Sequence, residues 1–180
     1  MSARVPTIQT GIDAILRWDA AVLAAAAGFE RRGTRSVMRA LTRAGDPAGW
    51  IVHVLVLSAL LRVETNALVV MTAAGATATV ASQFAKRAFR RSRPTAAIVG
   101  FVAHATDPDP FSFPSGHSAV AFAIATAAWT IDPILAAVET ALAASIAASR
   151  IYLGAHYPGD VIGGIALGVV CGLASGAVLA

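Results

Sequence analysis

Long apolar runs, separated by short polar stretches, constrain this chain more than any other feature of its sequence. Hydrophobic residues make up 57% and charged residues only 13% of its 180 positions, and the mean hydropathy is +0.69. Soluble domains carry about 25% charged residues. A chain of this length favours one domain. The sequence therefore predicts a single all-α domain, residues 1–180, folded as an integral-membrane helical bundle.

We expect about five transmembrane helices within residues 46–180, the membrane-embedded core. Gly45 lies where one helix can end, and Pro47 and Pro133 lie where helices can start. The expected spans are residues 47–61, 67–85, 117–129, 133–150 and 158–180. Since a bilayer core is about 30 Å thick, the shorter spans need their flanking residues to cross it.

The first 45 residues are expected to form amphipathic helices in the membrane interface. Residues 8–29 have apolar residues at helical spacing but also contain Asp13, Arg17 and Asp19. Each charge costs about 2.5–3.5 kcal/mol at the bilayer centre, so insertion is unfavourable. Four arginines at steps of three and four then share one helical face: Arg32, Arg35, Arg39 and Arg43. This face is predicted to bind anionic lipid headgroups, and an ordinary solvated face is the alternative.

The charge balance and the cysteine content limit the kinds of binding partner and metal site that this chain can have. The formal net charge is +4, and the positive charges border apolar spans, so we expect lipid headgroups and not nucleic acid as partners. Lys86 is the one lysine among 14 basic residues, and the planar fork of arginine fits phosphate oxygens. Cys171 is the one cysteine, which excludes an intrachain disulfide and a zinc site built from cysteines.

Three polar clusters lie at the ends of the expected spans. They are Lys86 with Arg93-Pro94, then Pro114-Ser115-Gly116-His117, and then Ser149-Arg150 followed by His156 and Asp160. The second and fourth spans end at a cluster, and the third and fifth begin at one. All four ends therefore face the same side, and we expect the clusters to meet in one pocket.

These residue types predict binding of a phosphate group. Lys86, Arg93 and Arg150 supply three cations that can surround a dianionic phosphate with charge-assisted hydrogen bonds. Ser115 and Gly116 precede a helix, so their backbone N–H groups and the helix dipole add to the anion site. Gly116 also lacks a Cβ, which lets the backbone approach the ligand closely.

Two histidines can turn binding into reaction. His156 and Asp160 are four residues apart, a spacing that lets the carboxylate accept a hydrogen bond from one imidazole nitrogen. The other nitrogen is then free to attack phosphorus. His117 is expected to act as the general acid that protonates the departing alkoxide.

The complete pattern resembles the three-part signature of the type 2 phosphatidic acid phosphatase (PAP2) family, which also includes the vanadium haloperoxidases. Every signature position and internal spacing is filled between Lys86 and Asp160. The resemblance implies a helical bundle, a phosphohistidine intermediate on His156, His117 as the acid, and independence of metals and other cofactors. It assigns phosphate binding to Lys86, Arg93, Ser115, Gly116 and Arg150. Membrane members commonly have six spans, one more than expected here, so the role of the N-terminal third is open.

The expected activity is hydrolysis of a phosphomonoester of a membrane lipid, such as a polyprenyl-linked phosphate, phosphatidate or phosphatidylglycerol phosphate. A polyprenyl pyrophosphate phosphatase or a lipid phosphotransferase using the same pocket is the alternative. A catalytically silent lipid-binding protein is disfavoured, because a binder needs cations but no nucleophile. The apolar spans exclude a soluble haloperoxidase.

The arginine distribution predicts the orientation in a bacterial inner membrane. If the N-terminal third does not span, its arginines share a side with the catalytic loop, and Arg62 lies at the opposite end. The positive-inside bias then places the active site on the cytoplasmic face. Arg87, Arg90 and Arg91 contribute to this bias and are not expected to serve catalysis. Glu139, in mid-span, is expected to be structural, either protonated or paired between helices.

Overall fold

The protein is described by a computed structural model that covers residues 8–28, 32–59, 62–97, 102–105 and 107–179. Its helices, in chain order, are α1 (Ile8–Gly28), α2 (Arg32–Ala44), α3 (Pro47–Ala59), α4 (Thr65–Phe89), α5 (Pro94–Ala97), α6 (Gly116–Ala128), α7 (Pro133–Tyr152) and α8 (Pro158–Leu179). Within the described ranges no strand forms, and Ser92 and Phe111 make an isolated bridge. The predicted all-α bundle is confirmed.

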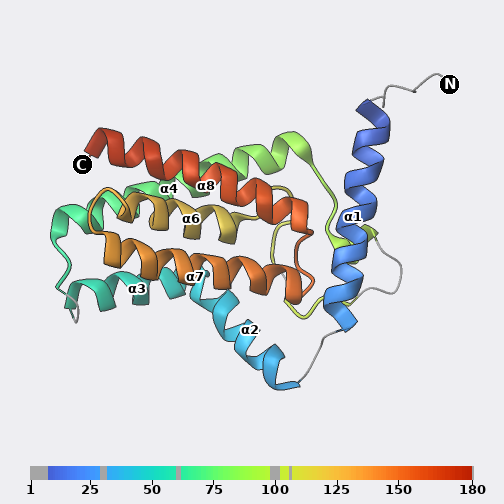
Figure 1. Cartoon of the computed structure of the whole chain (residues 1–180), viewed down its shortest axis with the longest axis horizontal. Helices are drawn as coiled ribbons and strands as arrows, with labels where there is room; N and C mark the ends of the chain where they lie inside the picture. The colour runs from blue at the N-terminus through green and yellow to red at the C-terminus, as the bar shows by residue number, and fades with distance from the viewer. Residues whose placement is uncertain (1–7, 29–31, 60–61, 98–101, 106, 180) are drawn as a thin grey trace.

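Helix α6 lies at the centre of the bundle, where it packs against α4, α7 and α8 (Figure 1). Its interior face consists of small residues: Ala119, Ala121, Ala123, Ala125, Ala127 and Ala128 are each at most 2% exposed. Small side chains let helices approach closely, which is how helices associate in lipid. Ser115 caps the start of α6, and Asp132 caps the start of α7 by accepting from Leu135 N at 2.7 Å.

The contact between α6 and α8 depends on glycines spaced four residues apart. A Cβ on Gly164 would lie 2.5 Å from the carbonyl oxygen of Ser115, and one on Gly168 would lie 2.4 Å from that of Ala119. Gly172 meets the next turn of α6 in the same way. Real Cβ atoms do not come this close to backbone oxygen, so the close approach requires glycine.

The described bundle helices lie close to the five predicted spans, and some are short, as expected. Of the described helices, α4, α7 and α8 are long and apolar enough to cross a membrane. Helices α3 and α6 have 13 residues each, which corresponds to about 20 Å at 1.5 Å per residue. The five predicted core helices are therefore present, but two are shorter than a bilayer core of about 30 Å.

The N-terminal helices lie outside this bundle. Helix α1 lies across the end of the bundle at which α8 begins, and α2 runs obliquely towards α3 (Figure 1). A bundle that crosses a membrane along its length places a helix across its end in the membrane surface. This arrangement agrees with the interfacial placement of residues 1–45, which stays a prediction; residues 1–7 and 29–31 lie outside the described part.

Candidate active site

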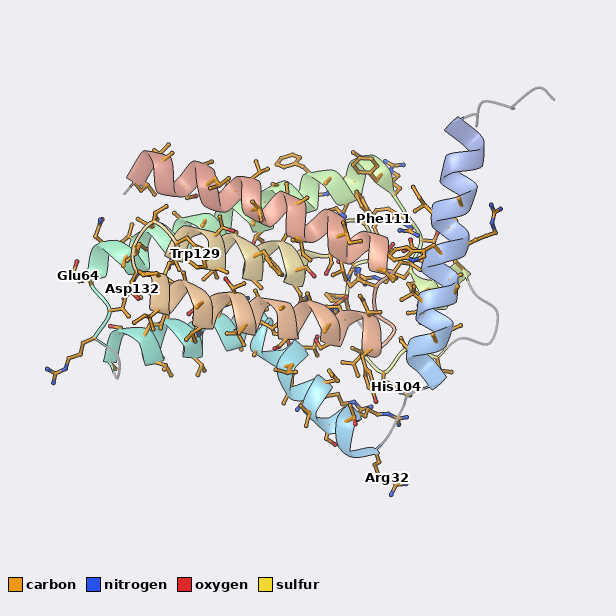
Figure 2. All side chains as sticks on the ribbon, viewed as in Figure 1. Arg32, Glu64, His104, Phe111, Trp129 and Asp132 are labelled. Atoms are coloured by element: carbon orange, nitrogen blue, oxygen red, sulfur yellow. The ribbon has the colours of Figure 1, made fainter. Side chains whose placement is uncertain are left out.

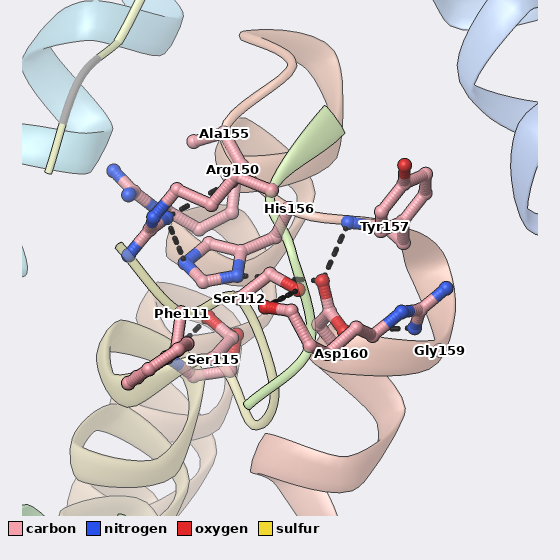
Figure 3. Close-up of polar contacts among 12 residues, drawn as sticks. Phe111, Ser112, Ser115, Arg150, Ala155, His156, Tyr157, Gly159 and Asp160 are labelled. Atoms are coloured by element: carbon pink, nitrogen blue, oxygen red, sulfur yellow. Dashed lines mark hydrogen bonds and ion pairs between the residues drawn. The ribbon is translucent and has the colours of Figure 1, made fainter. Parts of the chain in front are cut away.

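The three polar clusters meet at the end of the bundle that α1 covers. Lys86 lies in α4 and Arg93 in the loop that follows it. Ser115 caps α6, and Gly116 and His117 form its start. Arg150 lies near the end of α7, His156 in the turn between α7 and α8, and Asp160 at the start of α8. Figure 3 shows His156, Arg150 and Asp160 side by side. The structure thus brings all the predicted site residues together, and their individual roles stay predictions.

His156 is buried, with 1% of its surface exposed. Its Nε2 lies 3.3 Å from Arg93 Nη1 and 3.3 Å from Asp107 Oδ2. Its Nδ1 lies 3.6 Å from Asp160 Oδ2, which is longer than a hydrogen bond. Among the described residues this nitrogen has no hydrogen-bond partner. The Asp160 carboxylate therefore lies beside the His156 ring as predicted, but the expected hydrogen bond between Asp160 and Nδ1 is not formed in this structure.

The position of the Asp160 carboxylate is set by other donors. Oδ2 accepts from the backbone N–H of Tyr157 at 2.9 Å (Figure 3), and Oδ1 accepts from Arg91 Nη1 at 2.8 Å. Arg91 also donates to Asp19 Oδ2 at 2.6 Å and lies 4.2 Å above the ring centre of Tyr157. The sequence did not indicate this direct contact of Arg91 with Asp160, and the expectation that Arg91 does not serve catalysis stays a prediction.

Two aspartates that lie outside the three predicted clusters are placed among the cations. Asp107 Oδ2 accepts from Arg93 Nη1 at 2.7 Å and also from Arg150 Nη2. Asp109 Oδ2 accepts from Lys86 Nζ at 2.6 Å. A signal for these contacts exists in the sequence: buried cations are costly without counter-ions, and these aspartates are the acidic residues between the first two clusters.

Both aspartates are ionised in this environment. Burial by itself would raise the pKa of Asp107, but the contact with His156 and the charges of Arg150 and Arg93 lower this pKa well below its ordinary value. Burial likewise opposes ionisation of Asp109, whose pKa is nevertheless lowered by Lys86 and Arg93. The cation cluster therefore already holds carboxylate oxygens, which stand where the oxygens of a bound phosphate are expected.

Ser115 and Gly116 have different positions relative to the predicted anion site. The backbone N–H of Ser115 donates to the carbonyl oxygen of Asp160 at 2.9 Å, so this donor already has a partner within the protein, and phosphate binding by Ser115 stays a prediction. Gly116 lines the cavity, and a Cβ there would meet only Ser82 Oγ, at 3.7 Å. Packing among the described residues therefore does not require glycine at position 116, and its absent side chain leaves room on the ligand side.

The N-terminal third contacts each part of the site. Asp19 of α1 accepts from Arg91 and from the backbone N–H of Gly159, Thr42 of α2 accepts from Arg150, and Asp46 contacts His117. Asp19 is fully buried, although the sequence indicated a charge at the membrane surface. These described residues of the N-terminal third therefore pack on the catalytic end.

A cavity of about 500 Å³ leads from the site into the bundle between α3, α4 and α6. Lys86, Asp107, His117 and His156 line its charged end. Its inner part is lined mainly by apolar side chains, including Trp50, Leu57, Leu68, Met71, Val120 and Ile124. A polar pair lies beside it, since His53 Nε2 is 2.9 Å from Glu139 Oε1. Glu139 is thus paired between helices, one of the two possibilities expected for it.

The fold and the site together define a membrane enzyme class: a helical bundle with histidines and a cation cluster at one end, above an apolar cavity. The chain belongs to the PAP2 superfamily, whose family model matches residues 64–178. The resemblance seen in the sequence is confirmed, and the protein is a PAP2-type phosphatase.

Relatives and solved structures agree with this assignment. Decaprenylphosphoryl-5-phosphoribose phosphatase of Mycobacterium tuberculosis is 36% identical over 165 residues, which are 87% of this chain and 88% of that protein. The transmembrane PAP2-type phosphatidylglycerolphosphate phosphatase from Bacillus subtilis superposes with a TM-score of 0.75 at 23% identity, covering 90% of this chain and 84% of the other. Aquifex aeolicus LpxE superposes with a TM-score of 0.75 at 23% identity, covering 87% of this chain and 93% of the other.

Proposed function

We propose that the protein hydrolyses the phosphomonoester of a polyprenyl-linked lipid through a phosphohistidine intermediate on His156, without a metal. One observation carries the proposal: an anionic oxygen, that of Asp107, lies 3.3 Å from His156 Nε2 and is held by Arg93 and Arg150. A phosphate that replaces this carboxylate places its phosphorus in front of the imidazole nitrogen.

The reaction then proceeds in two displacements. In the first, Nε2 of His156 forms a bond to phosphorus, the ester P–O bond breaks, and the proton of His117 goes to the departing alkoxide oxygen. In the second, water attacks phosphorus as His117 takes its proton, and the P–N bond breaks to release inorganic phosphate. Arg93, Arg150 and Lys86 stabilise the charge on the non-bridging oxygens throughout.

The preference for a prenyl-linked substrate rests on the cavity and on the relatives. An apolar cavity that begins at the cation cluster suits an ester whose apolar tail continues directly from its polar end. The Mycobacterium tuberculosis relative is named for a decaprenyl-linked phosphoribose. Phosphatidate and phosphatidylglycerol phosphate carry two acyl chains on a glycerol, and a diphosphate needs space for a second phosphoryl group.

The test is phosphate release from the purified protein across a panel of lipid phosphates. We expect the largest kcat/KM on a prenyl-linked phosphomonoester, lower values on phosphatidate, phosphatidylglycerol phosphate and prenyl diphosphate, inhibition by vanadate, and no effect of chelators. Preference for the diphosphate would favour the alternative function. A rate that requires added magnesium would contradict the proposed mechanism.

We further propose that the active site faces the cytoplasm. The exposed arginines of α2 and of the end of α4 share the active-site end of the bundle, whereas Arg62 lies near the other end. In Figure 2, His104 marks the active-site end of the bundle and Glu64 marks the opposite end. The arginines of α2 and the end of α4 would then lie against the anionic headgroups of the inner leaflet, as the positive-inside bias requires.

Cysteine labelling tests this orientation. In a variant that lacks Cys171, Val102→Cys places a thiol at an exposed loop position of the active-site end, and Glu64→Cys places one at an exposed position of the opposite end. In intact cells an impermeant maleimide is expected to label Glu64→Cys, and to label Val102→Cys only after permeabilisation. Labelling of Val102→Cys in intact cells would reverse the orientation.

A further inference from the structure

A carboxylate from the junction between α2 and α3 contacts the histidine expected to act as general acid. Asp46 Oδ1 lies 2.8 Å from His117 Nε2, across 71 residues of sequence. The Asp46 side chain is half-exposed, whereas that of His117 is largely buried. A different carboxylate thus lies beside each histidine, Asp46 beside His117 and Asp160 beside His156.

The backbone holds Asp46 in this position. Its N–H donates to the carbonyl oxygen of Arg43 at 3.1 Å, and its own carbonyl accepts from Trp50 N at 3.0 Å. Trp50 Nε1 also donates to the carbonyl oxygen of Gly45 at 3.0 Å. A Cβ on Gly45 would lie 2.8 Å from His117 Cδ2, so this turn packs directly against the imidazole ring.

We propose that Asp46 is a positioning residue for His117. With Nε2 bound to the carboxylate, Nδ1 is the nitrogen left to give a proton to the leaving oxygen. The negative charge of Asp46 also stabilises the imidazolium form, which is the form that can act as an acid. Among the described residues, the charges of Asp107 and Arg150 also act on this ring, and both belong to the pocket proposed to bind the phosphate. The inference rests on the proposed function, since it presupposes that His117 protonates the alkoxide.

A pair of substrates with the same tail tests the proposal. A long-chain alkyl phosphate releases an alkoxide, which needs a proton, whereas the acyl phosphate of the same chain length releases a carboxylate, which does not. General acid catalysis contributes about 10²–10⁴-fold, and Asp46 acts on it through His117. The rate measured is that of the first displacement, as single-turnover release of the alcohol or the carboxylate, because hydrolysis of the phosphohistidine is common to both substrates. For this step we expect Asp46→Asn to lower the rate roughly 10- to 100-fold on the alkyl phosphate, with little change on the acyl phosphate.

The variants are chosen to separate this role from a structural one. Asparagine caps helices about as well as aspartate, so Asp46→Asn keeps the start of α3 intact. Asp132→Asn is the matched control, because Asp132 also precedes a proline at a helix start, at the other end of the bundle. This control is expected to leave both rates unchanged. An equal loss on both substrates in Asp46→Asn would assign a structural role and overturn the proposal.

His117→Ala distinguishes the two ways in which the inference can fail. If His117→Ala slows only the alkyl phosphate and Asp46→Asn slows neither, His117 is the acid but Asp46 does not position it. If His117→Ala slows the first displacement equally on both substrates, the assignment of His117 as the acid in the proposed function is itself wrong. Selective loss on the alkyl phosphate in both variants supports both statements.

Discussion

Replacing His156 by alanine is expected to remove phosphatase activity, with a loss of about 10⁴-fold or more, as when the nucleophile of a catalytic triad is deleted. The physical reason is that no other described side chain places a nitrogen nucleophile within 3.3 Å of the oxygen held by Arg93 and Arg150. Phosphate release and the labelling of the protein by a radioactive phosphate ester measure the two consequences. The wild-type protein should retain label that is stable in alkali and lost in acid, as a phosphoramidate is.

The control for this experiment is His104→Ala. His104 lies in the loop before the second cluster and does not line the cavity, so its replacement is expected to leave turnover close to that of the wild type. Thermal unfolding of both variants shows whether the bundle is intact. Turnover by a folded His156→Ala protein at the wild-type rate would reject the assigned nucleophile.

The second large effect is expected from Arg150→Lys. Arg150 is 1% exposed, and its two terminal nitrogens donate to different partners, Thr42 and Asp107. Lysine keeps the charge but loses this planar fork, so it cannot hold a phosphate oxygen and Thr42 in the same geometry. The removal of one such donor costs about 10²–10³-fold in other enzymes, and we expect a fall of this order in kcat/KM for the lipid phosphate.

Arg87→Lys provides the matched control, since Arg87 is exposed on the last turn of α4. Its rate is expected to equal that of the wild type within a factor of about two, the scale of a surface change. Equal rates for Arg150→Lys and the wild type would show that Arg150 acts through its charge alone. The planar geometry of its guanidinium group would then not be needed for catalysis.

Much of the bundle could be predicted because its helix ends carry local signals. The predicted spans 133–150 and 158–180 correspond closely to α7 (Pro133–Tyr152) and α8 (Pro158–Leu179), since a proline opens each of them. The site residues could be found for a related reason: each cluster lies at such an end, and the alternation of spans brings the ends to one side.

The contacts that complete the site could not be predicted in the same way. Asp19 and Arg91 are separated by 72 residues, and Asp46 and His117 by 71. Such pairs leave no periodic pattern in one sequence, because only the packing of α1, α2 and the loops decides which charges meet. From the sequence alone, the solvation cost of Asp19 predicts a position at the membrane surface. The ion pair with Arg91, which offsets this cost, is visible only in the structure.

The glycine contacts between α6 and α8 have a consequence for how this enzyme tolerates change. Gly164 abuts the carbonyl oxygen of Ser115, whose own N–H is bonded to Asp160. A methyl group added at Gly164 would thus push apart the starts of α6 and α8, which carry His117 and Asp160. A substitution that changes the spacing of these two helices therefore also changes the geometry of the catalytic residues. Glycine positions that do not line the cavity thus limit which mutations the reaction tolerates.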